Sequence, residues 1–217
     1  ISLGILLAVA VATAVLTGAM LVGDSVDQSL KMIASSRLGT AEFALQTYSK
    51  PFTEQLAGEL SKELNTNYAP LLKLNGLITS SDGSKRVNRV EIIGADKRFF
   101  NIGLAPDLFE NNTGIILNTS LAKRLGITDS QEVLLRIAKP SSVSRDIPLT
   151  PDSDLTVAFR ANVIDIADKE SFGDFSLLSN HLAPLNVFVP LKQLQQKLGL
   201  DGQVNTVLIA SNSSMDI

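Results

Sequence analysis

Few side chains in this sequence could carry out chemistry. The 217 residues contain no cysteine and a single histidine, His181. A disulfide framework, a thiolate zinc site, an iron–sulfur cluster, a cysteine nucleophile and a multi-histidine metal site are therefore excluded. His181 has no serine or carboxylate at a recognisable catalytic spacing, and its neighbours Asn180, Leu182 and Pro184 are typical of an exposed loop. We therefore expect no catalytic role for it.

Two pairs of aspartates could in principle bind calcium. They are Asp152 with Asp154, and Asp165 with Asp168. Neither pair has the glycine and glutamate spacing of an EF-hand loop, so we expect solvated loop carboxylates. The sequence also lacks the glycine-rich patterns that cradle nucleotide phosphates. It thus predicts no catalytic residue, no cofactor and no metal site.

The charged residues of the sequence narrow the class of binding partner. The 19 Lys and Arg residues stand against 22 Asp and Glu residues, for a net charge of −3. A nucleic-acid-binding protein needs a basic face to neutralise phosphates, so no nucleic acid is expected as a partner. The basic residues Lys85, Arg86 and Arg89 lie close together. A solvated strand face is their expected role, and contact with phosphate or lipid headgroups is the alternative.

Residues 1–23 form an uncharged, apolar stretch without proline. As a helix they would reach about 34 Å, against a hydrocarbon core of about 30 Å, which predicts a transmembrane helix. A cleaved signal peptide is the first alternative, although its apolar region is usually shorter, and a buried core helix is the second. The first charges that follow are acidic, at Asp24 and Asp27, which favours a non-cytoplasmic location for the remainder.

Small residues recur every four positions in this stretch, at Ala10, Ala14 and Gly18. Small side chains on one helix face let another transmembrane helix approach closely. An alanine-rich segment also produces this spacing by chance, so the two interpretations stay open. A packing face would predict partners in the membrane.

The helical pattern continues beyond the apolar stretch. Val22, Val26, Leu30 and Ile33 keep helical spacing, and Gly39 suits a helix stop. We therefore predict one long helix that leaves the bilayer and continues as a stalk over residues 24–39. Such a helix can carry motion between the membrane and an outer domain. Alternatively, its apolar residues pack on the core of that domain, and both interpretations can hold together.

Residues 40–217 alternate irregularly between strands and short helices. We expect strands at 41–48, 69–79, 86–94, 132–138, 155–166, 186–189 and 203–210, and helices at 52–64, 96–102, 118–126 and 191–198. The sequence Ser-Asp-Gly-Ser predicts a hairpin turn, and the polar segment 140–154 a long loop. This order predicts an α+β fold with mixed or antiparallel sheets, in one domain or two subdomains.

Several segments resemble a known family. In chain order they read GAMLVGDSVDQSLKMIASSRLG, VEIIGADKRFFNIG, GIILNTSLAKRLGI, NVFVPLKQLQQKLGL and QVNTVLIAS. With the preceding apolar helix, they resemble the MacB/FtsX-type permeases of bacterial ABC transporters, specifically the first transmembrane helix and the MacB-like periplasmic core domain. The resemblance covers nearly the whole chain. Its motifs look structural, since Phe99 and Phe100, for example, can fill a core.

The resemblance implies a membrane permease subunit with no enzymatic activity of its own. A separate cytoplasmic ABC ATPase subunit or domain would hydrolyse ATP, and a second permease copy would complete a dimer. The chain would lie in the lipid bilayer of the bacterial inner membrane, with its main domain in the periplasm or outside the cell. It would export or release a substrate, or act on a periplasmic or outer-membrane partner.

The main alternative is the extracytoplasmic sensor domain of a membrane-anchored signalling receptor, which would show the same span, continuous helix and α+β domain. A transporter subunit is expected to continue into three more apolar spans after Ile217, and a receptor into one span and a cytoplasmic signalling domain. A membrane-anchored secreted enzyme is a third interpretation. The lack of a recognisable nucleophile, metal site or acid–base constellation disfavours it.

Overall fold

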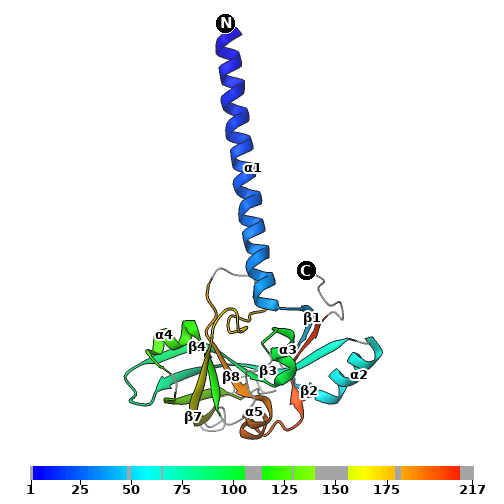
Figure 1. The fold of residues 1–217 in the computed structure, drawn as a ribbon, viewed down its shortest axis with the longest axis vertical. Helices are drawn as coiled ribbons and strands as arrows, with labels where there is room; N and C mark the ends of the chain where they lie inside the picture. The colour runs from blue at the N-terminus through cyan, green and yellow to red at the C-terminus, as the bar shows by residue number, and fades with distance from the viewer. Residues whose placement is uncertain are drawn as a thin grey trace, which may run out of the picture.

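The computed structural model describes residues 2–47, 50–64, 66–105, 114–128, 130–139, 156–178 and 182–210. One long helix, α1 (Ser2–Leu38), stands on a mixed α+β domain (Figure 1). This arrangement confirms the expected fold class. The predicted loop at 140–154 lies outside the described residues.

Helix α1 runs without interruption through the position where the apolar stretch ends. It contains 37 residues and is about 55 Å long at 1.5 Å per residue. Its apolar part is long and apolar enough to cross a membrane, with a mean hydropathy of 2.5 in the best window, none of which is buried. The continuous helix from membrane stretch to stalk is confirmed. The boundaries at residues 23 and 39 between span, stalk and domain remain a prediction.

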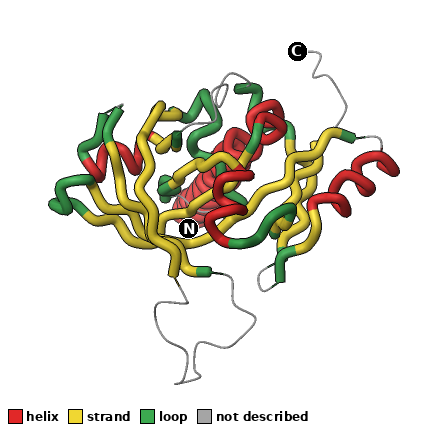
Figure 2. Tube along the Cα trace, turned by 90° about the horizontal axis from the view of Figure 1, so that it is seen from below, coloured by secondary structure: helices red, strands yellow, loops and turns green. Residues whose placement is uncertain are grey.

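The largest sheet has eight strands and closes on itself through β3 (Asn67–Ser80) (Figure 2). Residues 72–79 of β3 pair with β4, and residues 76–80 pair on the other edge with β6. The strands between them complete a ring in the order β4 (Arg86–Ala95), β8 (Asn186–Pro190), β5 (Ile115–Asn118), β7 (Thr156–Ala167) and β6 (Glu132–Ala138).

The beginning of β3 extends beyond this ring and carries two further strands. It pairs with β10 (Thr206–Ala210), and β10 pairs with β1 (Ala41–Gln46), which follows the stalk. A second, two-stranded sheet joins β2 (Phe52–Thr53) and β9 (Gln203–Val204). The remaining helices are α2 (Glu54–Leu64), α3 (Lys97–Ile102), α4 (Thr119–Leu125) and α5 (Leu191–Leu198).

Several strands of the large sheet lie between two hydrophobic cores, one on each face of the sheet. In β8, for example, Val187 and Val189 belong to the core inside the ring, whereas Phe188 belongs to a second core on the other face. This follows from the alternation of side chains along a strand. Strands buried on both faces read as continuous apolar runs, which explains the sequences Asn-Val-Phe-Val-Pro in β8 and Ile-Ile-Leu-Asn in β5.

Most of the predicted elements are confirmed within a residue or two. Asn118 caps α4 by accepting a hydrogen bond from the amide of Leu121 at 3.1 Å, and Gly126 ends the helix in the left-handed region. The strand at 132–138 and the helix at 191–198 have the predicted bounds.

Two boundaries were predicted wrongly. The helix expected from residue 52 begins at Glu54, because Phe52 belongs to β2 and pairs with Val204 of β9. Within the helix Leu56 is 42% exposed, whereas Ala57 is buried. The last strand is interrupted at Asn205, because its side chain bonds the backbone of Lys73. In both cases a distant segment competes with the local pattern.

The predicted hairpin turn between β3 and β4 is held by Asp82. Its Oδ1 accepts a hydrogen bond from the hydroxyl of Ser80 at 2.6 Å and from the amide of Ser84 at 3.1 Å. These bonds favour the charged carboxylate and lower the pKa of Asp82 from 3.8 to about 2.

We therefore predict that the carboxyl carbon of Asp82 titrates by NMR with a midpoint of about 2. The stabilisation of the turn is present above pH 3.8 and is lost as the pH falls through the native pKa. Replacing Ser80 by alanine removes the strongest bond and should return the midpoint toward 3.8. A midpoint near 3.8 in the unaltered chain would contradict this account.

Candidate functional site: the joint between stalk and domain

The last turn of α1 is inserted into the domain. Residues 37–40 and the residues that they contact form the joint between the stalk and the domain. Arg37 is 7% exposed, and its Nη2 donates a hydrogen bond of 2.9 Å to the backbone carbonyl of Leu182. Leu38 packs against the second core. Leu30 and Ile33 are half-buried, whereas Val26 is 49% exposed, so only the lower part of the predicted stripe is covered. The packing of this stripe on the core of the domain remains a prediction.

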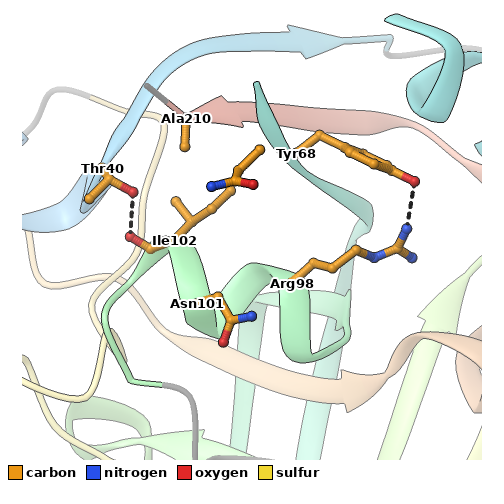
Figure 3. Close-up of a pocket in the computed structure, with 7 residues that line it drawn as sticks. Thr40, Tyr68, Arg98, Asn101, Ile102 and Ala210 are labelled. Carbon is orange, nitrogen blue, oxygen red and sulfur yellow. Dashed lines mark hydrogen bonds between the residues drawn. The ribbon is translucent and has the colours of Figure 1, made fainter. Parts of the chain in front are cut away.

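Gly39 and Thr40 fasten the chain where the helix ends. Gly39 has a φ of +59°, and a Cβ there would lie 2.6 Å from the carbonyl oxygen of Ile102. The same oxygen accepts hydrogen bonds from the amide and the hydroxyl of Thr40, each 3.0 Å long (Figure 3). Only glycine fits this turn without strain, and the chain after it is tied to the end of α3.

The ring of Phe172 fills the space behind this turn. A Cβ on Gly39 would lie 3.1 Å from its Cε2, and a Cβ on Gly103 would lie 2.2 Å from its Cγ. Phe172 itself has a φ of 62°, which is uncommon for a bulky residue. Asp168 starts the turn that leads to it and accepts a 2.7 Å hydrogen bond from the amide of Ser171, which lowers the pKa of Asp168.

Behind Phe172, a cluster of phenylalanines connects the joint to the sheet. Phe99 is fully buried, and its ring centroid lies 4.9 Å from Phe172, 5.0 Å from Phe100, 5.0 Å from Phe175 and 5.7 Å from Phe188 of β8. Edge-to-face and tilted rings at such distances add to the energy of apolar burial. The expectation that Phe99 and Phe100 fill a core is confirmed.

The other end of α3 is fixed by Arg98. Its Nε donates to Asp96 at 2.9 Å, its Nη1 donates to the hydroxyl of Tyr68 at 2.8 Å (Figure 3), and its Nη2 pairs with Glu54 of α2. Burial alone would lower the pKa of Arg98, but the hydrogen bonds and charges of Asp96 and Glu54 outweigh it and raise the pKa above its ordinary value. The guanidinium thus holds α2, α3 and β3 together.

A cavity of about 150 Å³ lies between Arg98 and the joint, lined by Thr40, Asn67, Asn101 and Ala210 among others (Figure 3). Pockets for drug-sized ligands measure about 300–1,000 Å³, so this space is too small for such a molecule.

The residues of the joint form hydrogen bonds and close packing rather than an acid–base or nucleophilic arrangement. Its geometry is suited to transmitting force between α1 and the second core.

The residues first considered for chemistry are not brought together here. Asp165 is exposed and accepts a hydrogen bond from the amide of Ile166, and the described residues contain no group of three or more His, Cys, Asp or Glu that could hold a metal. Asp152, Asp154 and His181 lie outside the described residues. The absence of catalytic and metal sites remains a prediction.

Sequence reasoning missed the parts of the joint that come from distant segments. The sequence pattern assigned no role in such a joint to Arg37 or to Phe172. One signal was available, because Arg37 follows Ile33 at helical spacing and so continues the stripe that the domain covers. Nothing in the local pattern around Phe172 indicates that its ring lies against Gly39 and Gly103.

Comparisons with known proteins agree with this architecture. A family model described as the MacB-like periplasmic core domain matches residues 2–217. The periplasmic region of MacB from Actinobacillus actinomycetemcomitans is similar in structure, with a TM-score of 0.51 and 12% identity over 87% of this chain and 81% of that chain.

The extracellular domain of the noncanonic ABC-type transporter YknZ from Gram-positive bacteria has a TM-score of 0.47 and 11% identity over 79% of this chain and 85% of that chain. The comparison with curated proteins gives no match. At such identities the structural likeness supports the fold alone. Because the family model matches nearly the whole sequence, the chain belongs to the family of MacB-like periplasmic core domains.

Proposed function

We propose that this chain is part of a membrane permease subunit of a bacterial ABC transporter. In this proposal residues 1–23 cross the inner membrane, residues 24–39 form the stalk, and residues 40–217 form a domain in the periplasm or outside the cell. A separate ATPase subunit hydrolyses ATP in the cytoplasm, and two permease copies work together. The domain performs no reaction of its own.

One observation carries the proposal: an unbroken helix ends in a buried, hydrogen-bonded joint. A flexible linker after a membrane anchor would only tether the domain. Here Arg37, Gly39 and Thr40 are each fixed to another segment, so a tilt or shift of α1 must move the second core with it. Membership of the family supports the transporter setting.

The experiment starts from the complete gene, expressed together with each candidate ABC ATPase subunit of the same organism. We expect the product to co-purify with one of them, and we expect the complex to hydrolyse ATP. Because the described domain and the rest of this sequence contain no cysteine, a single Ser81→Cys change at the hairpin tip gives a specific label site. A membrane-impermeant maleimide should label it in spheroplasts, and the complete chain without this change is the control for cysteines outside residues 1–217.

Two results would overturn the proposal. One is labelling of the Ser81→Cys chain only after lysis, which would place the domain in the cytoplasm. The other is a complete gene product that binds no ATPase and continues into a cytoplasmic signalling domain, which would favour the sensor alternative.

A further inference from the structure

A second, larger cavity lies beside the joint, on the outer side of the ring. It measures about 480 Å³ and is bordered by β4, by α4 and by the segment that leads into β8. This volume lies within the range of small-molecule pockets. Its lining combines charged and apolar side chains, among them Arg89, Glu91, Arg124, Leu178, Leu182 and Leu185. Leu182 is the residue whose carbonyl binds Arg37 of the stalk.

Arg89 reaches the cavity from a bulge in β4. In the pairing with β3, Leu77 is opposite Asn88 and Gly76 is opposite Val90, so Arg89 is an extra residue in its strand. Its φ of 57° lies in the left-handed region, which a long side chain rarely adopts. Bulges re-aim side chains and are frequent beside binding sites.

The charged groups of the cavity leave binding capacity unused. Arg89 and Arg124 are exposed, and neither forms an ion pair with a described residue. Glu91 uses one oxygen, Oε1, for a 3.1 Å ion pair with Lys73. Its other oxygen, Oε2, is buried and has no hydrogen-bond partner within the described part of the chain. A buried oxygen without a partner is costly, and a bound donor would relieve that cost.

These groups define the chemistry of a ligand. The guanidinium groups of Arg89 and Arg124 attract an anion, and a carboxylate or phosphate can accept two parallel bonds from a guanidinium. Glu91 lines the cavity, and a rotation of its side chain that brings the buried Oε2 to the cavity surface would let this oxygen accept a bond from an N–H or O–H group. Leu178 and Leu182 are 59% and 75% exposed, so they can lose water to an apolar chain.

We propose that this cavity binds an amphipathic molecule whose anionic group, a carboxylate or a phosphate, is accompanied by a hydrogen-bond donor. Two sources share this chemistry: a short apolar peptide, with its carboxylate and ammonium, and a phospholipid headgroup such as phosphoethanolamine. Binding here does not depend on whether the chain works in a transporter.

The test is isothermal titration calorimetry on the full chain in an uncharged sugar detergent. One probe is the dipeptide Leu-Leu, compared with its amide, which lacks the carboxylate. The other is dihexanoylphosphatidylethanolamine, compared with dihexanoylphosphatidylcholine, which lacks the donor. The variants are Arg89→Gly, which suits the positive φ and should keep the fold, and Arg124→Gln on the surface of α4. Lys123→Gln, the exposed neighbour on the same helix, is the matched control.

We expect saturable binding of Leu-Leu, of the phosphatidylethanolamine, or of both, and the arm that binds identifies the source. Each arginine variant should weaken binding by about tenfold or more, as expected for loss of a charge-assisted bond, and Lys123→Gln should leave it unchanged. The proposal is wrong if neither probe binds below about 1 mM. It is also wrong if both arginine variants bind normally, or if the amide or the phosphatidylcholine binds as tightly as its partner probe.

Discussion

In the proposed transporter, replacing Leu30 by proline is expected to uncouple ATP hydrolysis from movement of the outer domain. Leu30 lies within α1, between the apolar stretch and the buried Arg37. Proline removes the hydrogen bond to the carbonyl of residue 26 and its ring clashes with that carbonyl, which costs about 3 kcal/mol and kinks the helix. Assembly in the membrane should be retained, because residues 1–23 are unchanged.

The measurement combines ATPase activity with distances between the two copies. Spin labels on Ser81→Cys should show a change in the distance between copies when ATP binds, and this change and the transport of substrate should be lost in the Leu30→Pro chain while hydrolysis continues. Leu30→Ala is the control, because alanine removes the same apolar side chain but favours the helix. Normal transport in the proline variant would refute coupling through α1.

Replacing Phe99 by alanine is expected to lower the free energy of unfolding by about 3–5 kcal/mol, because it leaves a large cavity in a core that cannot collapse around it. Phe99 is fully buried and contacts four other phenylalanine rings, including Phe172 behind the joint. The loss should also loosen the joint, so hydrogen exchange at the amide of Thr40 should become faster than in the unaltered chain.

Denaturant unfolding followed by circular dichroism measures the first effect, and exchange detected by mass spectrometry the second. Phe43→Ala is a matched control, because Phe43 lies on strand β1 and is 67% exposed. A surface substitution of this kind should change stability by about 0.5 kcal/mol or less. Equal losses in the two variants would show that the second core does not depend on Phe99.

The local elements were predictable because their signals lie within a few residues. An uncharged, apolar stretch of 23 residues predicts a membrane helix without reference to the rest of the chain. Asn118 marks the start of α4 by its capping side chain, and Gly126 marks its end by its left-handed backbone. The turn at Asp82 is likewise closed by its immediate neighbours. The family resemblance was also readable, because it depends on the order of short motifs along the chain.

Where distant segments meet, the sequence pattern was not sufficient. Phe52 fits the helical stripe as well as Leu56, and only its pairing with Val204 places it in a strand. In the same way, the turn at Asp82 indicates that β3 pairs with β4, but nothing local in β3 shows that its other edge binds β6 and so closes the sheet. The β2–β9 and β3–β6 pairings each join residues that are more than fifty positions apart in the sequence.

The sequence by itself indicated the long apolar helix and its continuation beyond residue 23, most of the strands and helices, and the family. Only the tertiary structure decided how the stalk is held, since the joint unites residues near positions 40, 102 and 172. It alone placed Arg89, Glu91 and Arg124 around one cavity. The physical reason is that helix and turn signals act over a few residues, whereas a packed joint or a pocket depends on which distant surfaces the whole chain buries together.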